Sequence, residues 1–173
     1  MEFPKSIKAA SCCFTGHRPE KLGSAAFGLY DSASPVRAHL RAAVERAWEA
    51  GYTHFICGMA RGSDMAFALE VIELKDREEG VFLEVAIPCP EQTQRWSDED
   101  KARYEHILSR CDMISVISEK YTPSCMMERN RYMTLRSDRL IALYNNTGGG
   151  TAKTVGFARR DCRETEIIDP SRL

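Results

Sequence analysis

The sequence predicts a three-layer α/β fold, in which a mostly parallel sheet lies between two layers of helices. Short apolar segments alternate along the chain with segments of helical periodicity, which is typical of parallel sheets. The central apolar segments lack polar alternation, as expected of strands that are buried on both faces. The chain has 173 residues, of which 43% are hydrophobic and 28% charged, so we expect a single domain over residues 1–173.

The expected elements follow one another in strand–helix order. Residues 8–14 form an apolar run that ends at the turn-forming segment Thr15–Pro19, which predicts a buried first strand. Ser34 and Pro35 fit an N-cap and a first helical residue, and apolar residues then recur at helical spacing up to Gly51. The same patterns predict a strand at 53–57, a helix at 63–75, a strand at 81–87, a helix at 98–110, a strand at 112–118, a helix at 124–136, a strand at 139–144, a helix at 151–160 and a strand at 166–168.

The order of the strands decides where a ligand would bind. We expect the first strand at the centre, the second and third on one side, and the fourth and fifth on the other. Ligands of such sheets bind outside the carboxyl ends of the strands, at the point where the strand order reverses. The loops that follow the strands are therefore the place where functional residues are expected.

Charge and cysteine content narrow the class of protein. Lys and Arg number 24 against 25 for Asp and Glu, a net charge of −1, so no overall field attracts DNA or an anionic membrane and any anion site is local. The seven cysteines include no CxxC pair, and the N-terminal segment carries charges in place of a leader's apolar run. No run approaches the ~20 apolar residues of a membrane span. We expect a cytoplasmic protein with buried structural cysteines, no metal site and no cofactor.

Two glycine-containing loops each lead into a predicted helix. Gly58 and Gly62 permit positive φ angles and a close approach of the backbone to a ligand, and Ser63 and Asp64 lie where the helix begins. The unpaired N–H groups of a helix N-terminus favour phosphate or another anion. The alternative is that the glycines only make turns and that Asp64 caps the helix.

The second loop comprises Gly148, Gly149, Gly150 and Thr151, with the Thr151 hydroxyl available as a donor or as an N-cap. Turn formation and capping are again the alternative. Two such loops at one edge of a sheet suit a nucleotide-like ligand. The dinucleotide GxGxxG and the Walker GxxxxGK[ST] patterns are both absent, which disfavours ordinary NAD binding and P-loop NTPase activity.

The helix predicted after the fourth strand carries Arg129 and Asn130 in its first turns. Met126, Asn130 and Met133 share a helical face that we expect to point at the core, with Arg129 beside it. A solvated side chain is the alternative for Arg129. We favour a functional role, because an arginine at this edge of the sheet is suited to bidentate binding of phosphate or carboxylate.

The residues after the first strand are also candidates. Thr15 and Gly16 make a tight exit, so the side chains of His17 and Arg18 are expected to project over the crevice. For His17 the alternative is a hydrogen-bonded place in a turn. For Trp96 we favour packing in the core or as a lid over the stacking of a base.

Five segments of the chain together resemble a known family. They are TGHRP after the first strand, CGMARGSD after the second, residues 88–96, YTPSCMMERNRYM, and LIALYNNTGGGTAKTVGFA. In this order they resemble the YpsA-like branch of the SLOG superfamily, which also includes DNA-processing protein A and the Lonely Guy phosphoribohydrolases.

The resemblance implies a Rossmann-like domain that binds nucleotides or nucleotide-derived ligands. Gly58, Arg61, Gly62, Ser63 and Asp64 match the family's GGARGxD-type loop, although a methionine at position 59 stands where a second glycine is frequent. The segment 129–133 is similar to the Arg-Lys-x-x-Met helix motif of the Lonely Guy enzymes.

The same resemblance bears on catalysis. The Lonely Guy enzymes carry a catalytic glutamate after their PGGxGT loop, where this chain has Lys153 or Thr154. Cleavage of an N-glycosidic bond needs a carboxylate, and a lysine ammonium opposes the developing positive charge. Asp64 and Glu128 are the nearest substitutes in the sequence, of which one is expected to cap a helix and the other to face solvent.

We therefore rank a non-enzymatic sensor or regulatory module that binds a nucleotide-like small molecule first. A nucleoside-monophosphate phosphoribohydrolase with an unrecognised acid is the alternative, and single-stranded DNA binding ranks third because of the net charge and the 9% aromatic content. Self-association through Met126, Met127 and Met133 and plain core packing of these residues are both open. No catalytic residue is assigned. The ligand-binding residues that we expect are Thr15, Gly16, His17, Arg18, Gly58, Arg61, Gly62, Ser63, Asp64, Arg129, Asn130, Gly148, Gly149, Gly150 and Thr151.

Overall fold

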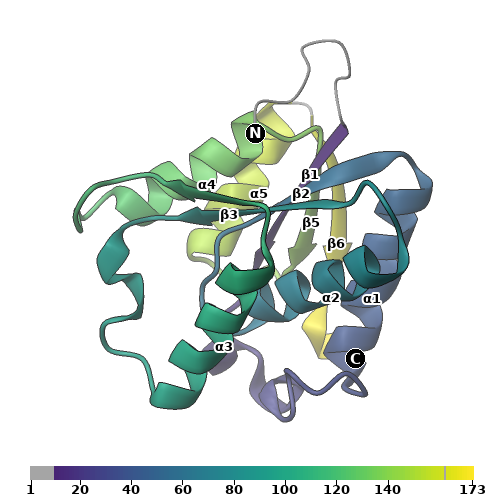
Figure 1. The fold of residues 1–173 in the computed structure, drawn as a ribbon, viewed down its shortest axis with the longest axis horizontal. Helices are drawn as coiled ribbons and strands as arrows, with labels where there is room; N and C mark the ends of the chain where they lie inside the picture. Colours follow the sequence, from purple (N-terminus) through teal and green to yellow (C-terminus); the bar gives the residue numbers. More distant parts are fainter. Residues whose placement is uncertain (1–9, 162) are drawn as a thin grey trace.

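The computed structural model of the chain describes residues 10–161 and 163–173 (Figure 1). It contains a six-stranded sheet in which all neighbouring strands are parallel. The strands are β1 (Ala10–Gly16), β2 (Tyr52–Cys57), β3 (Phe82–Ile87), β4 (Met113–Val116), β5 (Arg139–Leu143) and β6 (Glu164–Ile168). The α-helices are α1 (Pro35–Glu49), α2 (Ser63–Arg77), α3 (Asp98–Arg110), α4 (Cys125–Leu135) and α5 (Gly150–Arg160). Short 3₁₀ helices are η1 (Pro19–Lys21), η2 (Gly23–Ala26), η3 (Pro90–Thr93) and η4 (Pro170–Arg172).

The predicted α/β fold and its alternation of strands and helices are confirmed. Helix α3 has the predicted bounds, and α1 begins at Pro35 after a Ser34 cap whose side chain accepts from the backbone N–H of Arg37. Strand β6 begins two residues earlier than predicted, at Glu164, and is parallel to β5. The first two residues of the strand predicted at 8–14 lie outside the described residues.

The predicted strand order is wrong in one respect. The observed order is β4-β3-β2-β1-β5-β6, so β4 lies beside β3 at the edge of the sheet, and β5, not β4, pairs with β1. All five residues of β5 are buried, which suits a position inside the sheet, whereas Ile114 and Val116 of β4 are 49% and 51% exposed. Both segments are apolar in sequence, so their composition does not separate a central strand from an edge strand. The strand order therefore reverses between β1 and β5.

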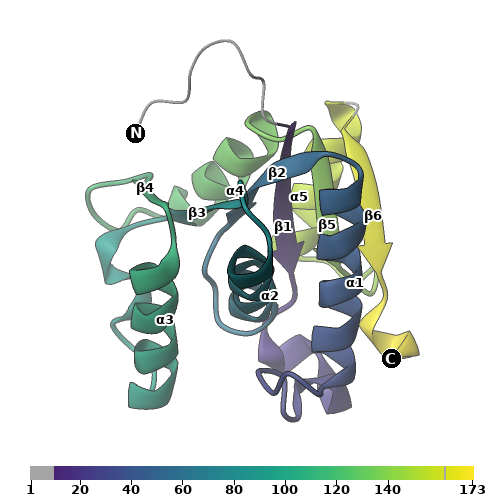
Figure 2. The same cartoon turned by 45° about the vertical axis from the view of Figure 1, so that its right-hand side comes forward.

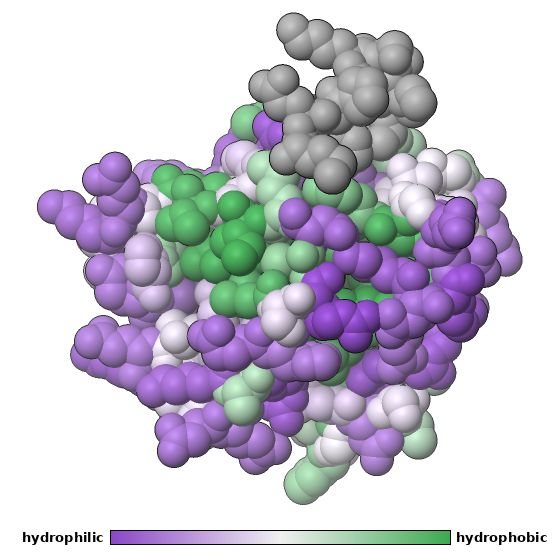
Figure 3. Space-filling view, in the orientation of Figure 1, coloured by the Kyte–Doolittle hydropathy of each residue, from purple (hydrophilic) through white to green (hydrophobic). Residues whose placement is uncertain are grey.

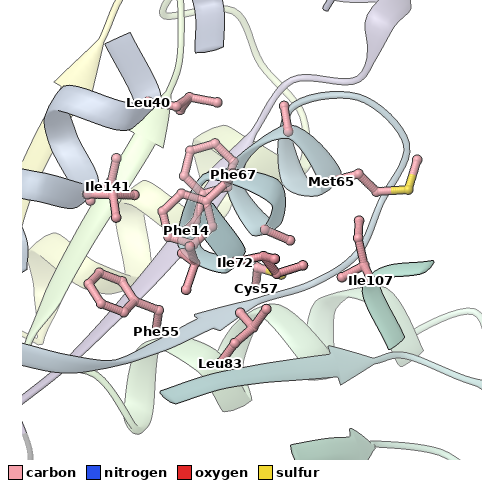
Figure 4. Close-up of a cluster of buried hydrophobic side chains, with 14 of the residues drawn as sticks. Phe14, Leu40, Phe55, Cys57, Met65, Phe67, Ile72, Leu83, Ile107 and Ile141 are labelled. Atoms are coloured by element: carbon pink, nitrogen blue, oxygen red, sulfur yellow. The ribbon is translucent and has the colours of Figure 1, made fainter. Parts of the chain in front are cut away.

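The sheet lies between two layers of helices, as predicted. Helices α1, α2 and α3 cover one face, and α4 and α5 cover the other (Figures 1 and 2). The larger core lies between the sheet and helices α1, α2 and α3. There Phe14 stacks on Phe67 with 4.5 Å between ring centroids (Figure 4). The smaller core packs Met133 and Val155 against Leu140. Met133 is thus a core residue and does not contribute to a contact surface with Met126 and Met127.

The surface carries one apolar feature along the edge strand. Met113, Ile114 and Val116 of β4 are exposed, and Figure 3 shows hydrophobic surface where Figure 1 places β4 and α4. Elsewhere this face is mostly hydrophilic. No helix in the described part of the chain combines the length and the apolar character needed to cross a membrane.

The junction of β1 and β5 positions the candidate site. The last residue of β1, Gly16, lies opposite Leu143 of β5, and the backbone N–H of His17 donates to the carbonyl of Leu143 at 3.2 Å. Helices α2 and α5 begin beside these strand ends, each after a glycine with positive φ: Gly62 at +95° and Gly149 at +127°. The carboxyl ends of the two strands and the N-termini of the two helices therefore meet at one edge.

Candidate functional site

A cavity of about 320 Å³, called the site cavity below, lies at the carboxyl ends of β1 and β5. Its walls come from the loop after β1, the first turns of α2, α4 and α5, and the loop before α2. The expected residues that line it are Thr15, Gly16, His17, Arg18, Asp64, Arg129, Asn130, Gly150 and Thr151. The remaining expected residues do not line it: Gly58, Arg61, Gly62, Ser63, Gly148 and Gly149.

Asp64 and Arg129 are two buried, oppositely charged groups in the wall of the site cavity. Each is 5% exposed. The Asp64 carboxylate accepts the backbone N–H of Ala60 at 3.1 Å, so it joins the loop to the helix and does not cap α2, whose N-cap is Gly62. Burial raises the pKa of Asp64 to about 6, although the Arg129 cation and the Ala60 N–H act in the opposite direction. Burial also lowers the pKa of Arg129, against the effect of the Asp64 carboxylate.

Arg129 is held by internal hydrogen bonds and is buried, which contradicts the alternative of a solvated side chain. Its Nη1 donates to the carbonyl of Gly58, and its Nε donates to Oδ1 of Asn130 at 2.7 Å. These bonds occupy part of the guanidinium and hold it against the cavity wall. Arg129 is therefore a structural support as well as a lining residue, and its removal would take away a cation that lowers the pKa of the buried Asp64.

Position 58 requires a glycine to leave room for the Arg129 side chain, and not because its φ angle is positive. A Cβ at Gly58 would overlap the guanidinium of Arg129, so only glycine leaves room for the side chain. The left-handed conformation falls on the next residue, Met59, at φ +58°. A non-glycine residue is disfavoured there by about 1 kcal/mol, which gives a physical reason for a glycine at this place in the family pattern.

The other small residues of these loops are also packed against protein atoms. The Ser63 hydroxyl donates to the carbonyl of His17 at 2.8 Å, and a Cβ at Gly16 would overlap that hydroxyl. A Cβ at Gly62 would lie 2.7 Å from Cδ of Pro19. Ser63, Gly16 and Gly62 thus bring the loop after β1 onto the start of α2.

His17 is held in a turn, the alternative that the sequence left open. Its Nε2 lies 2.7 Å from Oδ1 of Asn145, in the loop after β5. Burial lowers the pKa of His17, although the hydrogen bond with Asn145 opposes this. The neutral ring therefore links the loops after β1 and β5.

The glycine loop before α5 is closed by a lysine that the sequence analysis missed. Nζ of Lys21 donates to the carbonyl of Gly148 at 2.5 Å, and Lys21 also lines the site cavity. The N-cap of α5 is Gly149, which has no side chain to accept hydrogen bonds from the first N–H groups of the helix. Gly150 and Thr151, in the first turn, line the cavity.

Two arginines differ in how free their charges are. Arg18 is exposed and lines the site cavity, and its guanidinium makes no ion pair or hydrogen bond to a residue that the structure describes. Arg61 pairs with Glu20 at 2.7 Å and lines a neighbouring hollow instead. Arg18 is therefore the cation with the most freedom to meet an anion here.

Four lining residues were not expected from the sequence: Glu20, Lys21, Ala60 and Met126. Lys21 follows the TGHRP segment closely, so its place after β1 was a usable signal. Its partner Gly148 is far away in the chain, and no local pattern predicts that contact.

The residues considered for catalysis are widely separated. Lys153 is exposed and lies with Met127 and Phe157 on the outer side of α5, away from the site cavity. The hydroxyl of the buried Thr154 donates to the carbonyl of Gly150. Glu128 is exposed, as expected, and accepts from the Ser124 hydroxyl at 2.6 Å. The argument that the Lys153 ammonium opposes charge at the sugar is therefore wrong, because the side chain lies elsewhere.

Known proteins resemble this chain in sequence and in fold. A family model named YpsA, described as the YspA SLOG family, matches residues 12–167. A UPF0398 protein of Bacillus pumilus (strain SAFR-032) is 25% identical over 80% of this chain and 75% of its own length. An uncharacterized SPbeta prophage-derived protein, YoqJ of Bacillus subtilis (strain 168), is 29% identical over 61% of this chain and 69% of its own length.

Solved structures of DNA processing protein A share the fold. The protein from Helicobacter pylori, described for its unique single-stranded DNA binding mode, superposes with a TM-score of 0.63 at 11% identity over 93% of this chain. The protein from Streptococcus pneumoniae superposes with a TM-score of 0.61 at 15% identity over 94% of this chain. The chain spans 66% and 51% of these two proteins.

Proposed function

The chain belongs to the YpsA SLOG family, and from this premise we propose that it binds a nucleotide or nucleotide-derived anion in the site cavity, as a sensor or regulatory module. The observation that carries the proposal is the meeting of two helix N-termini and a free arginine at one cavity. Helices α2 and α5 both begin there, and no described side chain caps either of them. Helix N-termini favour anions through their unpaired N–H groups and their dipole.

Arg18 supports the same conclusion. Its guanidinium adds a cation without a described ion-pair partner to a site that already holds one buried acid, Asp64, and one buried cation, Arg129. A phosphate group that meets Arg18 and the first turn of α5 would gain charge-assisted hydrogen bonds. The volume of about 320 Å³ lies at the small end of the range for small-molecule pockets, as a phosphorylated nucleoside requires.

Binding is tested by isothermal titration of AMP and ADP-ribose into the wild type and into Arg18→Ala. Removal of the arginine is expected to weaken binding by about 1.5–3 kcal/mol, or about ten- to a hundredfold. Arg159→Ala is the matched control, because Arg159 is an exposed residue of α5 outside the cavity. Equal affinities in the three proteins would contradict the proposal.

A second pair of variants tests the α5 end without changing charge. Gly150→Ala places a methyl group beside the cavity at an ordinary 3.9 Å from Nδ2 of Asn130, so the protein is expected to fold and to bind AMP more weakly. Gly156→Ala, in the same helix and in open space, is the control. If Gly150→Ala binds as well as the control, the ligand does not reach α5.

A phosphoribohydrolase is the second candidate, and one observation favours it. Asp64 lies in the cavity with a pKa raised to about 6, and a carboxyl group with such a pKa is suited to general acid–base chemistry. Against this, burial of the carboxyl group accounts for the raised pKa without any catalytic role, and the Arg129 cation only reduces the rise. We rank binding without catalysis first.

We expect no release of ribose 5-phosphate from AMP, GMP, CMP, UMP or IMP above the rate in buffer. The measurement is product analysis with wild type, Asp64→Asn and Glu128→Gln, of which the last changes an exposed acid outside the cavity. Release by the wild type and by Glu128→Gln that is lost in Asp64→Asn would establish the hydrolase instead.

A further inference from the structure

The site cavity continues into two further hollows along the same edge of the molecule. The first, the middle hollow, has a volume of about 480 Å³ and shares Arg18, Ala60 and Met126 with the site cavity. The second, the outer hollow, has a volume of about 450 Å³ and shares Gln92 and Trp96 with the middle hollow. One groove therefore leads from the start of α5 to the segment after β3.

The middle of this groove is lined by cations. Arg18 borders both the site cavity and the middle hollow, and Arg95 borders both the middle and the outer hollows. Arg95 is exposed and, like Arg18, has no ion pair with a described residue. A ligand that extends beyond the site cavity thus passes two free guanidinium groups, which favour phosphate oxygens.

The far end of the groove offers an aromatic surface. Trp96 borders both the middle hollow and the outer hollow. Its ring packs at 89° to that of Tyr104, with 5.5 Å between ring centroids. This perpendicular contact fixes the indole while the residue still lines the groove. Tyr121 lines the outer hollow as well and is exposed. Aromatic side chains in such a place stack on planar rings, including every nucleobase.

Gln92 adds a buried hydrogen-bond acceptor that has no donor among the described residues. Its Nε2 donates to the carbonyl of Gly58 at 3.3 Å, while its Oε1 is buried and receives no hydrogen bond from any described residue. A buried acceptor without a donor is unfavourable. Because Gln92 lines both the middle hollow and the outer hollow, rotation of its side-chain amide would let Oε1 accept a hydrogen bond from a ligand in the groove.

From this arrangement we infer a second subsite, in which Trp96 stacks on the second ring of a two-headed nucleotide. The ligand class is two nucleosides joined through phosphates. One half lies in the site cavity, the phosphates meet Arg18, and the second base lies against Trp96 beside Gln92 and Arg95. The inference rests on the proposed function and adds the size and shape of the ligand to it.

The groove suits a short ligand more than a nucleic-acid strand. Acidic residues border each part of it: Glu20 at the site cavity, Asp100 at the middle hollow and Glu91 at the outer hollow. A strand needs a continuous basic track for its phosphates, and its binding falls steeply with salt. A dinucleotide needs only the two arginines between its bases.

Affinities for AMP and for diadenosine diphosphate test the second subsite. The wild type is expected to bind diadenosine diphosphate about tenfold more tightly than AMP, because stacking of one base contributes on that scale. In Trp96→Leu this preference is expected to fall below about twofold. Trp48→Leu is the matched control, since Trp48 lies on α1 outside the groove, and it should keep the wild-type preference.

A second measurement does not depend on the stability of Trp96→Leu. The chain has two tryptophans, so Trp48→Phe leaves Trp96 as its single indole fluorophore. Diadenosine diphosphate is expected to quench this fluorescence by stacking, and AMP to quench it much less.

The outcomes separate the two claims. Binding of AMP with no preference for diadenosine diphosphate and no quenching would overturn the second subsite and leave the proposed function standing. Absence of binding by both ligands would overturn the proposed function and the subsite with it. Tighter, strongly salt-dependent binding of an oligo(dA) strand would overturn the subsite in favour of a nucleic-acid groove.

Discussion

Asp64 is the residue whose charge state bears most directly on ligand binding. Its carboxyl group has a pKa raised to about 6 by burial and faces Arg129 of α4 and Arg18 of the loop after β1. Since the pKa is raised in the folded state, Asp64 favours folding most at pH values below its unfolded pKa, and this contribution is lost as the pH rises through about 6. Protonation also removes a negative charge from a cavity that is proposed to hold an anion.

We therefore expect the affinity for AMP to rise as the pH falls from 7.5 to 5.5. Asp64→Asn is expected to bind AMP more tightly than the wild type at pH 7.5, by on the order of 1 kcal/mol, and to lose most of this pH dependence. Titration calorimetry at several pH values measures both effects, with phosphate ionisation of AMP common to the two proteins. The same pH dependence in the two proteins would assign it to the ligand and not to Asp64.

At the scale of single residues, the sequence predicted which loops border the site cavity better than which contacts each residue makes. The loops after β1, β2 and β5 were found because the carboxyl ends of parallel strands share an edge. The roles of Gly58 and Arg129 were not found, because their contact joins residues far apart in the chain. Met59 was noted as a departure from the family pattern, and its positive φ explains why a departure there matters.

At the scale of elements, a buried polar network ties four strands and α4 together. Nδ1 of His54 lies 3.0 Å from Oγ of Ser11, and its Nε2 lies 2.8 Å from Oε2 of Glu84. The hydroxyls of Ser115 and Tyr132 donate to Oε1 of Glu84 at 2.7 and 2.6 Å. The sequence analysis treated β3 as an apolar strand and did not expect a role for its fully buried glutamate.

The network gives Glu84 an unusual acidity. Burial alone would raise its pKa, but the hydrogen bonds from His54, Tyr132 and Ser115 outweigh burial and lower the pKa to about 2. A lowered pKa in the folded state means that ionised Glu84 stabilises the fold above its unfolded pKa. This contribution is lost as the pH falls through about 2.

We expect Glu84→Gln to lower the free energy of unfolding by about 2–4 kcal/mol at pH 7, because one donor in the network then meets an N–H₂ group. Urea unfolding monitored by circular dichroism measures the loss, which should shrink toward pH 2. Glu78→Gln, at an exposed position after α2, is the control and should change stability little. Equal stability of the two variants would show that the network does not stabilise the fold.

At the scale of the whole molecule, the fold class was predictable and the strand order was not. Periodicity is a local property, so each strand and helix could be predicted from its own segment. Pairing depends on which segments are covered, and the sequences of β4 and β5 are both apolar. The structure resolves this, because β5 is buried at every position and β4 is an edge strand.

The pairing of β1 with β5 also has a consequence during synthesis of the chain. Strand β1 leaves the ribosome first among the described strands, and β2 can then pair with one edge of it and β3 with β2. Its other edge stays open until β5 emerges, so the nascent chain carries a central strand with one unpaired edge for most of its translation. Open strand edges of this kind pair readily with other chains. A ribosome-bound intermediate is thus exposed to aggregation just where the finished protein holds its cavity, and a ligand cannot protect it before α5 is made.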